Sequence, residues 1–486
     1  MDIKPQHIIS AILAVVLIFL VPSSAFAQTE STVEISAYYA ASNNIDDDFS
    51  DVVIAGWNSM AGKIDISRFD MSVEEVQAAY FSLMNMHPEY FYVNNASSIN
   101  YYSTTGIASA IVPSYIFTKS ELPARKAEFN SAVDEALKCV DDNMTDVDKA
   151  LAIHDYISYI NAYDPIAAKG SYNINDIDLT SFSAYGCLVK NVSVCQGLSD
   201  AYALLMNRLG IECIVTLSDT MSHAWNIITL NGKNYHIDLT WDDQGCYNDE
   251  TLMPILSYSN HTYFLLSDSE IKEKGHSGWD SELTCSSYTG DKFWSDVHTH
   301  MNYKNGCWYY IQEDGKIIER KKNGTEKVIY TIPSDTFRLP DNTYKWLPKY
   351  SRLVENNGYL YFTTAKKIMR LDLDTGIAKT IYTAKFTYGY IVGLGIVDGE
   401  LKYDHYIGQQ QCEILLSTGY KAFDSQVASG DVDHDGTVNG KDVLQLRKYL
   451  VKLTDDVDES ESDLNNDGKI NLKDVFLLRK SIIGVA

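Results

Sequence analysis

The chain has 486 residues, which is long enough for two to four domains. Its 65 acidic and 40 basic side chains give a formal net charge of −25, which argues against nucleic acid or an anionic membrane as a partner. The eight cysteines are scattered without the short paired spacing of a zinc site, so zinc is not expected. Their spacing indicates no disulfide framework, although the sequence is compatible with isolated disulfide bridges.

The first 27 residues have the pattern of a secretory signal. Lys4 precedes an apolar run over 8–21, and Ala25-Phe26-Ala27 forms a small-residue cleavage site. The run is too short for a comfortable membrane span, and no later segment is long and apolar enough for one. The sequence therefore predicts a secreted, extracellular protein with no membrane insertion after cleavage.

Residues 28–60 are polar and poorly patterned. Helices are predicted over 72–84, with Ser72 as the cap, and over 145–160, with Thr145 and Asp148 in a capping box. His154 and Asp155 on the second helix could mimic a catalytic pair. Adjacent helix positions point in different directions, so we interpret this pair as structural.

Three short stretches then hold a cysteine, a histidine and an aspartate in chain order: Val194-Cys195-Gln196-Gly197, His223-Ala224-Trp225-Asn226, and His236-Ile237-Asp238-Leu239-Thr240-Trp241. Cys195 opens a predicted helix that runs to Leu209 and ends before Gly210. A thiol at a helix N-terminus faces unsatisfied N–H groups and the positive end of the helix dipole. Both favour the thiolate, which is the reactive form.

The histidine and the aspartate lie on the two strands of a predicted β-hairpin. Asn231-Gly232 lies between two alternating runs and predicts a type I′ turn. With this turn, positions 223 and 240 are predicted to pair, as are 225 and 238. His223 and Asp238 would then be diagonal neighbours on one face, about 7–8 Å apart at Cα.

These groups predict nucleophilic acyl transfer. Cys195 would attack an amide or acyl carbonyl, His223 would carry the proton, and Asp238 would orient the imidazole and stabilise its charged form. Taken singly, each residue is more often structural. Together, with a register that brings His223 to Asp238, they favour a catalytic site.

The motifs resemble the transglutaminase-like cysteine superfamily in its bacterial secreted branch, over about residues 70 to 295. The likeness extends to Met86-His87-Pro88-Glu89-Tyr90-Phe91, Ala152-Ile153-His154-Asp155-Tyr156 and Tyr263-Phe264-Leu265-Leu266-Ser267. It implies a papain-like α+β fold, the triad Cys195, His223 and Asp238, and transglutaminase or cysteine peptidase activity without a catalytic cofactor. Gln196 and Trp225 are candidates for shaping the site or donating to an oxyanion. Leu198-Ser199 departs from the Tyr-Ala of many relatives.

From 296 to 425 the sequence predicts a β-rich accessory region. Residues 306–311, 358–363 and 399–404 look like three imperfect copies of one β unit. They resemble propeller-blade repeats, but a closed propeller has four or more blades, so a small sheet or sandwich is an equal alternative.

Two calcium loops are predicted near the C-terminus, 32 residues apart. Oxygen ligands fall at loop positions 1, 3, 5, 9 and 12, and the backbone carbonyl of position 7 completes the set. The predicted ligands of the two Ca²⁺ ions are Asp431, Asp433, Asp435, Thr437, Asn439 and Asp442, then Asp463, Asn465, Asp467, Lys469, Asn471 and Asp474.

Each loop leads into one amphipathic segment, 443–450 or 475–482, so the pair is not two full EF-hands. Residues 426–486 look like a type I dockerin, the module that binds cohesin domains of a scaffold protein in cellulosome-type complexes. Basic residues recur at matching places in the two halves and suggest a twofold cohesin-binding surface: Lys441, Arg447 and Lys448, then Lys473, Arg479 and Lys480.

The sequence thus predicts a signal at 1–27, a transglutaminase-like domain with an N-terminal extension at 28–295, and then the accessory region and the dockerin. The predicted function is that of a cysteine-dependent acyl transferase or amidase/peptidase that acts on protein or peptide amides through a thioester. It would be secreted and tethered through a scaffold to a cell-surface complex. The alternative is a non-catalytic adaptor in a complex that breaks down polysaccharide.

Overall fold

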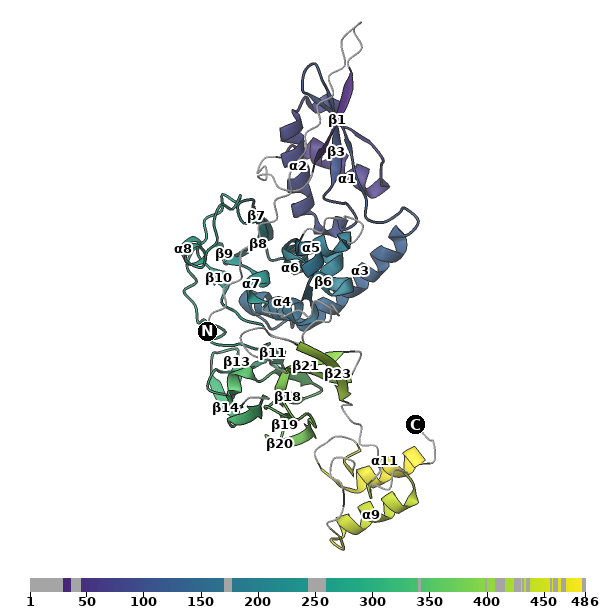
Figure 1. The fold of residues 1–486 in the computed structure, drawn as a ribbon, viewed down its shortest axis with the longest axis vertical. Coiled ribbons are helices and arrows are strands. Elements are labelled where there is room, and N and C mark those ends of the chain that lie inside the picture. Colours follow the sequence, from purple (N-terminus) through teal and green to yellow (C-terminus); the bar gives the residue numbers. More distant parts are fainter. Residues whose placement is uncertain are drawn as a thin grey trace. The chain divides into compact units, whose positions relative to one another are not determined.

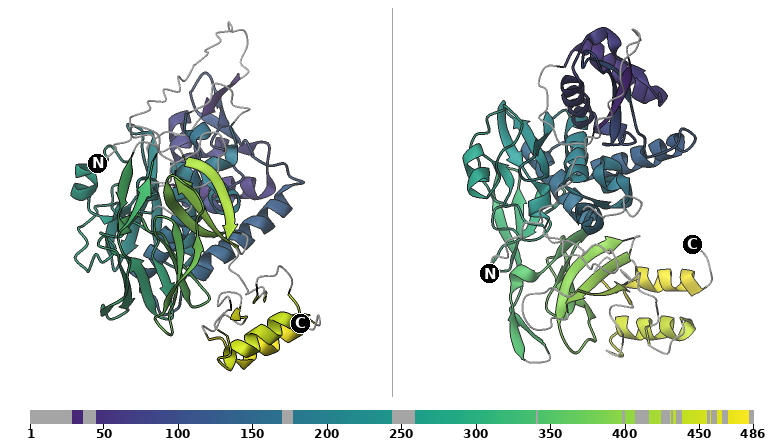
Figure 2. Two further views of the ribbon diagram at one scale, coloured as in Figure 1. Left: turned by 60° about the horizontal axis from the view of Figure 1, so that its bottom comes forward. Right: turned by 45° about the horizontal axis from the view of Figure 1, so that its top comes forward.

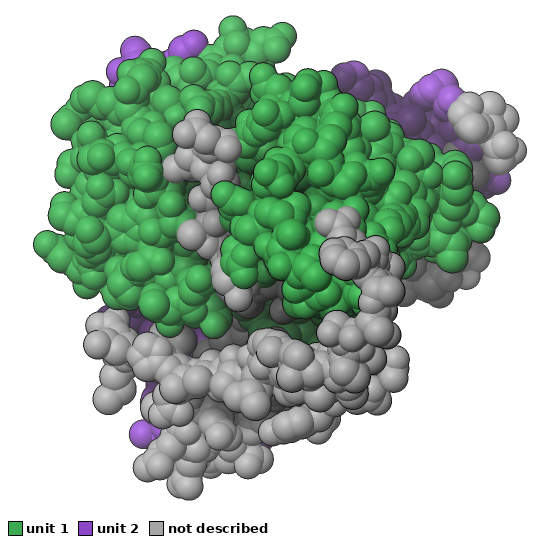
Figure 3. Space-filling view, turned by 90° about the horizontal axis from the view of Figure 1, so that it is seen from above, with its two compact units in different colours: residues 1–297 green, residues 298–486 purple. Residues whose placement is uncertain are grey.

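A computed structural model of the chain describes residues 29–35, 45–169, 177–243, 259–339, 342–397, 400–406, 416–423, 430, 432–433, 438–454, 457, 462–464 and 469–482. The chain divides into two compact units, residues 1–297 and 298–486, which are coloured separately in Figure 3. The predicted signal at 1–27 lies outside the described residues. In the described part of the chain, no helix combines the length and the apolar composition that a membrane crossing needs.

The first unit begins with a four-stranded antiparallel sheet in the order β1-β3-β4-β2, made of Glu30–Ile35, Ser97–Tyr102, Ala108–Val112 and Ile64–Asp65 (Figure 1). Helix α1, Asp47–Ser59, corrects the prediction that 28–60 is poorly patterned. Asp46 caps this helix, and Phe49, Val53 and Trp57 are buried one turn apart. That spacing is helical and is visible in the sequence between polar residues.

The predicted helices of the first unit are observed. Helix α2, Val73–Met86, has a capping box formed by Ser72 and Glu75, and α4, Asp146–Ile160, has one formed by Thr145 and Asp148. The other main helices are α3, Leu122–Ala136, α5, Pro165–Lys169, and α6, Cys195–Arg208. Cys195 is therefore the first residue of α6, as predicted.

A second antiparallel sheet has the order β10-β9-β8-β7, formed by Phe264–Leu266, Lys233–Ile237, His223–Leu230 and Cys213–Ser218. Helix α6 packs against β7 and β8 (Figure 1), and Figure 2 shows the same ribbon from two further directions. The short helices α7, Leu239–Asp242, and α8, Asp268–Glu273, follow β9 and β10. The cysteine helix therefore lies against the sheet whose strand β8 begins with His223.

The β8–β9 hairpin has the predicted register in its first part. Leu230 pairs with Lys233 and Asn226 with Ile237, and both turn residues, Asn231 and Gly232, have positive φ. The predicted pairs 223–240 and 225–238 are wrong. The ladder ends at Ile237, because Asp238 becomes the N-cap of α7 and accepts the backbone N–H of Trp241.

The second unit begins with antiparallel strands that follow one another along the chain. One sheet is β11 to β14, formed by Asn302–Lys304, Cys307–Ile311, Lys316–Lys321 and Glu326–Thr331. The next is β17 to β20, formed by Leu353–Asn356, Tyr359–Thr363, Lys367–Asp372 and Ala378–Thr383, and a third is β21 to β23, formed by Tyr390–Val397, Glu400–Tyr406 and Leu416–Phe423. The hairpin β15–β16, Asp335–Arg338 with Thr343–Trp346, precedes the second sheet.

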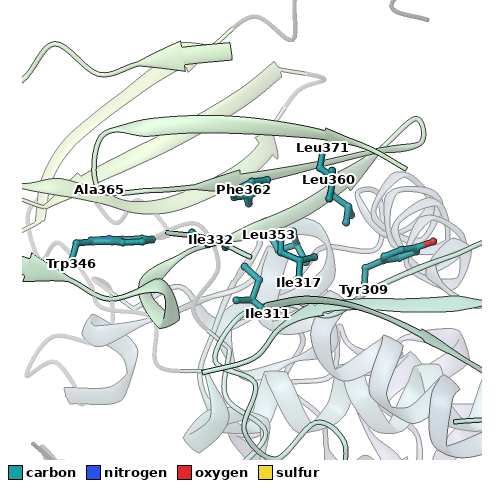
Figure 4. Close-up of a cluster of buried hydrophobic side chains, with 10 residues drawn as sticks. All are labelled: Tyr309, Ile311, Ile317, Ile332, Trp346, Leu353, Leu360, Phe362, Ala365 and Leu371. Atoms are coloured by element: carbon teal, nitrogen blue, oxygen red, sulfur yellow. The ribbon is translucent and has the colours of Figure 1, made fainter. Parts of the chain in front are cut away.

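The three sequence copies correspond to β12, β18 and β22, which are inner strands of the three sheets. The same positive-φ Asn-Gly turn precedes β12 and β18, at Asn305-Gly306 and Asn357-Gly358. The first two sheets share one buried core (Figure 4), formed by Tyr309, Ile311, Ile317, Ile332, Trp346, Leu353, Leu360, Phe362, Ala365 and Leu371. This region is therefore a series of antiparallel sheets with a shared interior.

In the part of the C-terminal segment that the structure describes, helices α9, Gly440–Leu450, and α11, Leu472–Ile482, pack on each other. Each begins within the last three positions of a predicted loop, three residues before the predicted amphipathic segment. Their buried core is small and consists of Val432, Leu446, Val475 and Leu478.

Candidate active site

Two short parallel strands bring Cys195 to its position. Strand β6, Val192–Ser193, leads directly into α6 and pairs with β5, Ala162–Tyr163. Cys195 as a residue is partly exposed, as a reactive cysteine requires. The described cysteines are all free: Cys139, Cys187, Cys195, Cys213, Cys285 and Cys307.

Gly197 allows the first turn of α6 to pack closely on the preceding loop. A Cβ atom at this position would lie 2.7 Å from the carbonyl oxygen of Ser181 and 2.8 Å from Cβ of Ser193. Backbone and β-carbon atoms cannot move aside as a flexible side-chain end can. The glycine in the Cys-Gln-Gly stretch thus has a packing role.

Replacing Gly197 with alanine is expected to lower the free energy of unfolding by about 1–3 kcal/mol, because the added methyl group overpacks this contact. Urea denaturation of both proteins measures the change. Gly210→Ala is a poor control because its φ of +75° adds strain, whereas Gly62, with no atom within 4 Å of its Cβ position, offers a matched site. An unchanged midpoint for Gly197→Ala would contradict the packing role.

His223 and Asp238 form a buried ion pair. His223 Nε2 lies 2.8 Å from Asp238 Oδ2, although the two residues are not in paired strands. The imidazole also forms a hydrogen bond with the Cys195 thiol, and this contact lowers the pKa of Cys195. The structure thus brings Cys195, His223 and Asp238 together in the order that the sequence predicts.

The charges of this triad favour the ionised forms. Burial alone would lower the pKa of His223, but the charge and hydrogen bond of Asp238, with those of Cys195, raise it to about 10. Burial alone would raise the pKa of Cys195, but His223 and the backbone N–H of Ala224 lower it. Burial would also raise the pKa of Asp238, and the charge of His223 lowers it well below its usual range. The site therefore favours a thiolate beside an imidazolium.

Tyr163 is a member of the site that sequence reasoning missed. Its hydroxyl forms hydrogen bonds with both the thiol and the backbone N–H of Cys195, and burial raises its pKa. The β5–β6 pairing places it there, since Tyr163 pairs with Ser193, two residues before Cys195. A Tyr-Asp-Pro stretch far upstream carries no signal for this contact.

The two site-shaping candidates have other hydrogen-bond partners. Trp225 stacks on His223 with ring centroids 5.6 Å apart, and its Nε1–H donates to His236 Nδ1. Gln196 donates to the Asp200 carboxyl at 2.7 Å. Trp225 thus shapes the wall behind the imidazole, while Gln196 points along α6.

A buried acid–histidine network lies beyond the far end of α7. Asp242 accepts from His154 at 3.2 Å, and Asp155 accepts from His261 at 2.8 Å. His154 and Asp155 are fully buried, which agrees with the structural interpretation. Because Asp238 caps α7 and Asp242 ends it, this network anchors the short helix that follows Asp238.

Three clusters in the described residues bring together side chains of metal-ligating type: His154, Asp155 and His261; His223, Asp238 and His276; His236, Asp268 and Cys285. In the third, Trp225 donates to Nδ1 of His236, so Nε2 carries the proton that Asp268 accepts. A protonated Nε2 has no free lone pair with which to bind a metal ion. In the other two, direct histidine–carboxylate contacts of 2.7–2.8 Å fill the space between the groups.

The described residues of the calcium loops place oxygen atoms together at the start of each helix. Asp442 and Asp474 are fully buried, and each accepts the backbone N–H of the asparagine at loop position 9. Asp442 also accepts the backbone N–H of Asp433. Five predicted ligands lie outside the described residues: Asp431, Asp435, Thr437, Asn465 and Asp467.

The outer faces of α9 and α11 are apolar as well as basic. Leu472 and Phe476 are 73% and 63% exposed and line a hollow with Lys473 and Leu477. On α9, Leu444 occupies the position that matches Phe476, and it is also exposed. Five of the six predicted basic residues are exposed, and Lys480 is partly buried. The apolar positions are an addition to the predicted surface.

Comparisons with known proteins identify one part of the chain. The family model for the dockerin type I domain matches residues 429–483. One solved structure, described as a crystal structure of a TGase, is 14% identical with a TM-score of 0.23, and the match covers 46% of this chain. This chain spans about half of that protein, 53% of its length. A search of curated proteins found no match. The dockerin prediction is confirmed: residues 429–483 form a type I dockerin domain.

Proposed function

We propose that the first unit is a papain-like, transglutaminase-like enzyme that transfers acyl groups from protein or peptide amides. The observation that carries the proposal is the position of His223, between the Cys195 thiol and the buried Asp238 carboxylate. This is the arrangement of nucleophile, base and orienting group that acyl transfer requires.

In the proposed reaction, the Cys195 thiolate attacks the carbon of a glutamine carboxamide or a peptide carbonyl. The negative charge that develops on oxygen is stabilised by the backbone N–H of Cys195 and the O–H of Tyr163, which exchange their hydrogen bonds to each other and to the thiol for the oxyanion. The His223 imidazolium gives its proton to the leaving ammonia or amine, and a thioester remains. An amine or water then attacks the thioester, and His223 removes the proton from the attacking group. Amine attack gives transfer, and water attack gives hydrolysis.

Tyr163→Phe is expected to lower kcat about 10²–10³-fold, the usual effect of removing one oxyanion donor. The phenyl ring keeps the packing, so the thermal midpoint should change little. Steady-state kinetics on one glutamine peptide would measure the loss. Tyr159→Phe, four residues earlier near the end of α4, is the matched control. A kcat within twofold of the parent would remove Tyr163 from the mechanism.

The direct test of the activity uses casein with a fluorescent primary amine. Mass spectrometry of the casein distinguishes amine incorporation from conversion of glutamine to glutamate and from chain cleavage. We expect at least one of these products from the parent protein and none from Cys195→Ala. If neither casein nor any member of a panel of other amide substrates is changed, the adaptor function is favoured instead.

We further propose that the dockerin attaches the enzyme to a cohesin domain of an extracellular scaffold. Dockerin domains occur in secreted components of cellulosomes, and this supports the predicted export. The predicted oxygen ligands would hold two Ca²⁺ ions, and the buried Asp442 and Asp474 carboxylates fit this role, since buried charge needs a counter-ion. Calcium would supply structural charge only.

The duplicated basic residues of the dockerin predict two equivalent modes of binding. Alanine at Arg447 and Lys448, or at Arg479 and Lys480, should each weaken cohesin binding by only about twofold, since the loss of one of two equal modes halves the association constant. Alanine at all four positions should abolish binding. Titration calorimetry against one cohesin measures this. A large loss from one pair alone would show a single mode.

A further inference from the structure

His276 is a second histidine at the catalytic carboxylate, and no sequence motif includes it. It follows α8 in a loop, with Gly275 before it at a φ of +107°. Its Nε2 lies 2.7 Å from Asp238 Oδ2, and its side chain is fully buried. His276 therefore contacts the carboxylate as closely as His223 does.

Three donors hold the Asp238 carboxylate. Oδ2 faces both His223 Nε2, at 2.8 Å, and His276 Nε2, at 2.7 Å. Oδ1 accepts the backbone N–H of Trp241 at 3.2 Å. A carboxylate has about four acceptor positions, so this set is compatible with full ionisation. Rotation about the Cβ–Cγ bond would break all three hydrogen bonds at once.

The ring of His276 is fixed by aromatic neighbours rather than by a second polar contact. Its centroid lies 4.4 Å from that of Trp241 and 5.0 Å from that of Trp225. Its Nδ1 has no hydrogen-bond partner among the described residues. Asp238 can only accept, so the tautomer with the proton on Nε2 satisfies this contact. The polar function of the side chain is directed at Asp238.

We propose that His276 is a positioning residue that holds Asp238 against His223, an inference that rests on the proposed acyl transfer. Without the Nε2–H of His276, Asp238 loses one of its two side-chain donors and can turn away from His223. His223 would then lose the charge that keeps it protonated. The titratable groups around His276 are Asp238, His223, His236 and Tyr263.

Two substitutions separate the hydrogen bond from the packing. His276→Leu keeps apolar volume but has no donor, whereas His276→Gln can place an amide N–H near the position of Nε2. The rate of Cys195 alkylation by iodoacetamide, followed by mass spectrometry from pH 5 to 10, reports on the triad without a substrate. Near-UV circular dichroism checks that each variant is folded, and His276→Asn, whose amide is too short to reach Asp238, replaces the leucine variant if that does not fold.

We expect His276→Leu to slow Cys195 alkylation at pH 7 on the order of 10²-fold, the usual effect of misplacing a catalytic group. The rise of the rate with pH should move to higher pH, because the Cys195 thiolate loses the stabilising charge of the His223 imidazolium. His276→Gln should restore most of the rate. In an Asp238→Asn background, His276→Leu should cause no further loss, because the residue acts through Asp238.

The inference would be overturned by an unchanged profile in His276→Leu, by a rise of the rate at lower pH than in the parent, or by losses that multiply in the double variant. Failure of the proposed function looks different. In that case Cys195 of the parent protein would react no faster than the partly exposed Cys307, whatever residue stands at 276.

Discussion

Replacing Asp238 with asparagine is expected to lower kcat/KM for an amide substrate by about 10⁴-fold, as loss of the orienting carboxylate does in a triad. Asparagine keeps the volume and caps a helix as well as aspartate does, so α7 should persist. What disappears is the negative charge that raises the pKa of His223 to about 10. Steady-state kinetics, with circular dichroism as a check on folding, measures the effect.

Asp268 provides the matched control for this variant. It is a second carboxylate that accepts from a histidine, His236, at 3.0 Å, and it lies outside the proposed triad. Asp268→Asn should change kcat/KM by less than about tenfold, because it removes a structural contact rather than the catalytic charge. Equal losses in the two variants would show that Asp238 has only a structural role.

Removing calcium from the full chain is expected to weaken cohesin binding at least ~10²-fold, because the metal-binding free energy of a small domain is also folding free energy. Among the described residues, the apolar core of this segment has four buried side chains, Val432, Leu446, Val475 and Leu478, so it offers little stability by itself. Binding measured with excess calcium and with excess chelator gives the ratio.

Alanine at both Asp442 and Asp474 should reproduce the effect of the chelator in the presence of calcium. Cys195 alkylation serves as the internal control and should be the same under all of these conditions, since no calcium ligand is proposed in the first unit. Cohesin binding that survives both chelation and the double substitution would contradict the calcium dependence.

The candidate triad was accessible from the sequence because local rules determine most of its geometry. The Asn231-Gly232 turn sets the register of the hairpin, and the position of Cys195 at a helix start follows from the apolar periodicity after it. The contact of His223 with Asp238 was predicted for a partly wrong reason, because Asp238 caps α7 instead of continuing β9. An aspartate at this position can end the strand and cap a short helix as readily as it can continue the β-ladder.

The remaining site residues could not be predicted because their contacts are tertiary. Tyr163 reaches Cys195 through a two-residue parallel pairing, and His276 reaches Asp238 from a loop with no periodic pattern. The acid–histidine contacts of His154 and His261 join segments more than 80 residues apart. Helix α1 was a different kind of miss, since its buried positions do recur at helical spacing.

The measurement that tests the account most directly is alkylation of Cys195 at about pH 6, where an ordinary thiol, with a pKa of about 8.5, is almost fully protonated. Mass spectrometry of the iodoacetamide-treated protein compares Cys195 with Cys139 and Cys307, two partly exposed thiols whose pKa values are raised by burial. We predict that Cys195 reacts at least ~10²-fold faster than either, and that His223→Ala removes this difference. Equal rates at the three cysteines, unaffected by His223→Ala, would contradict the catalytic account.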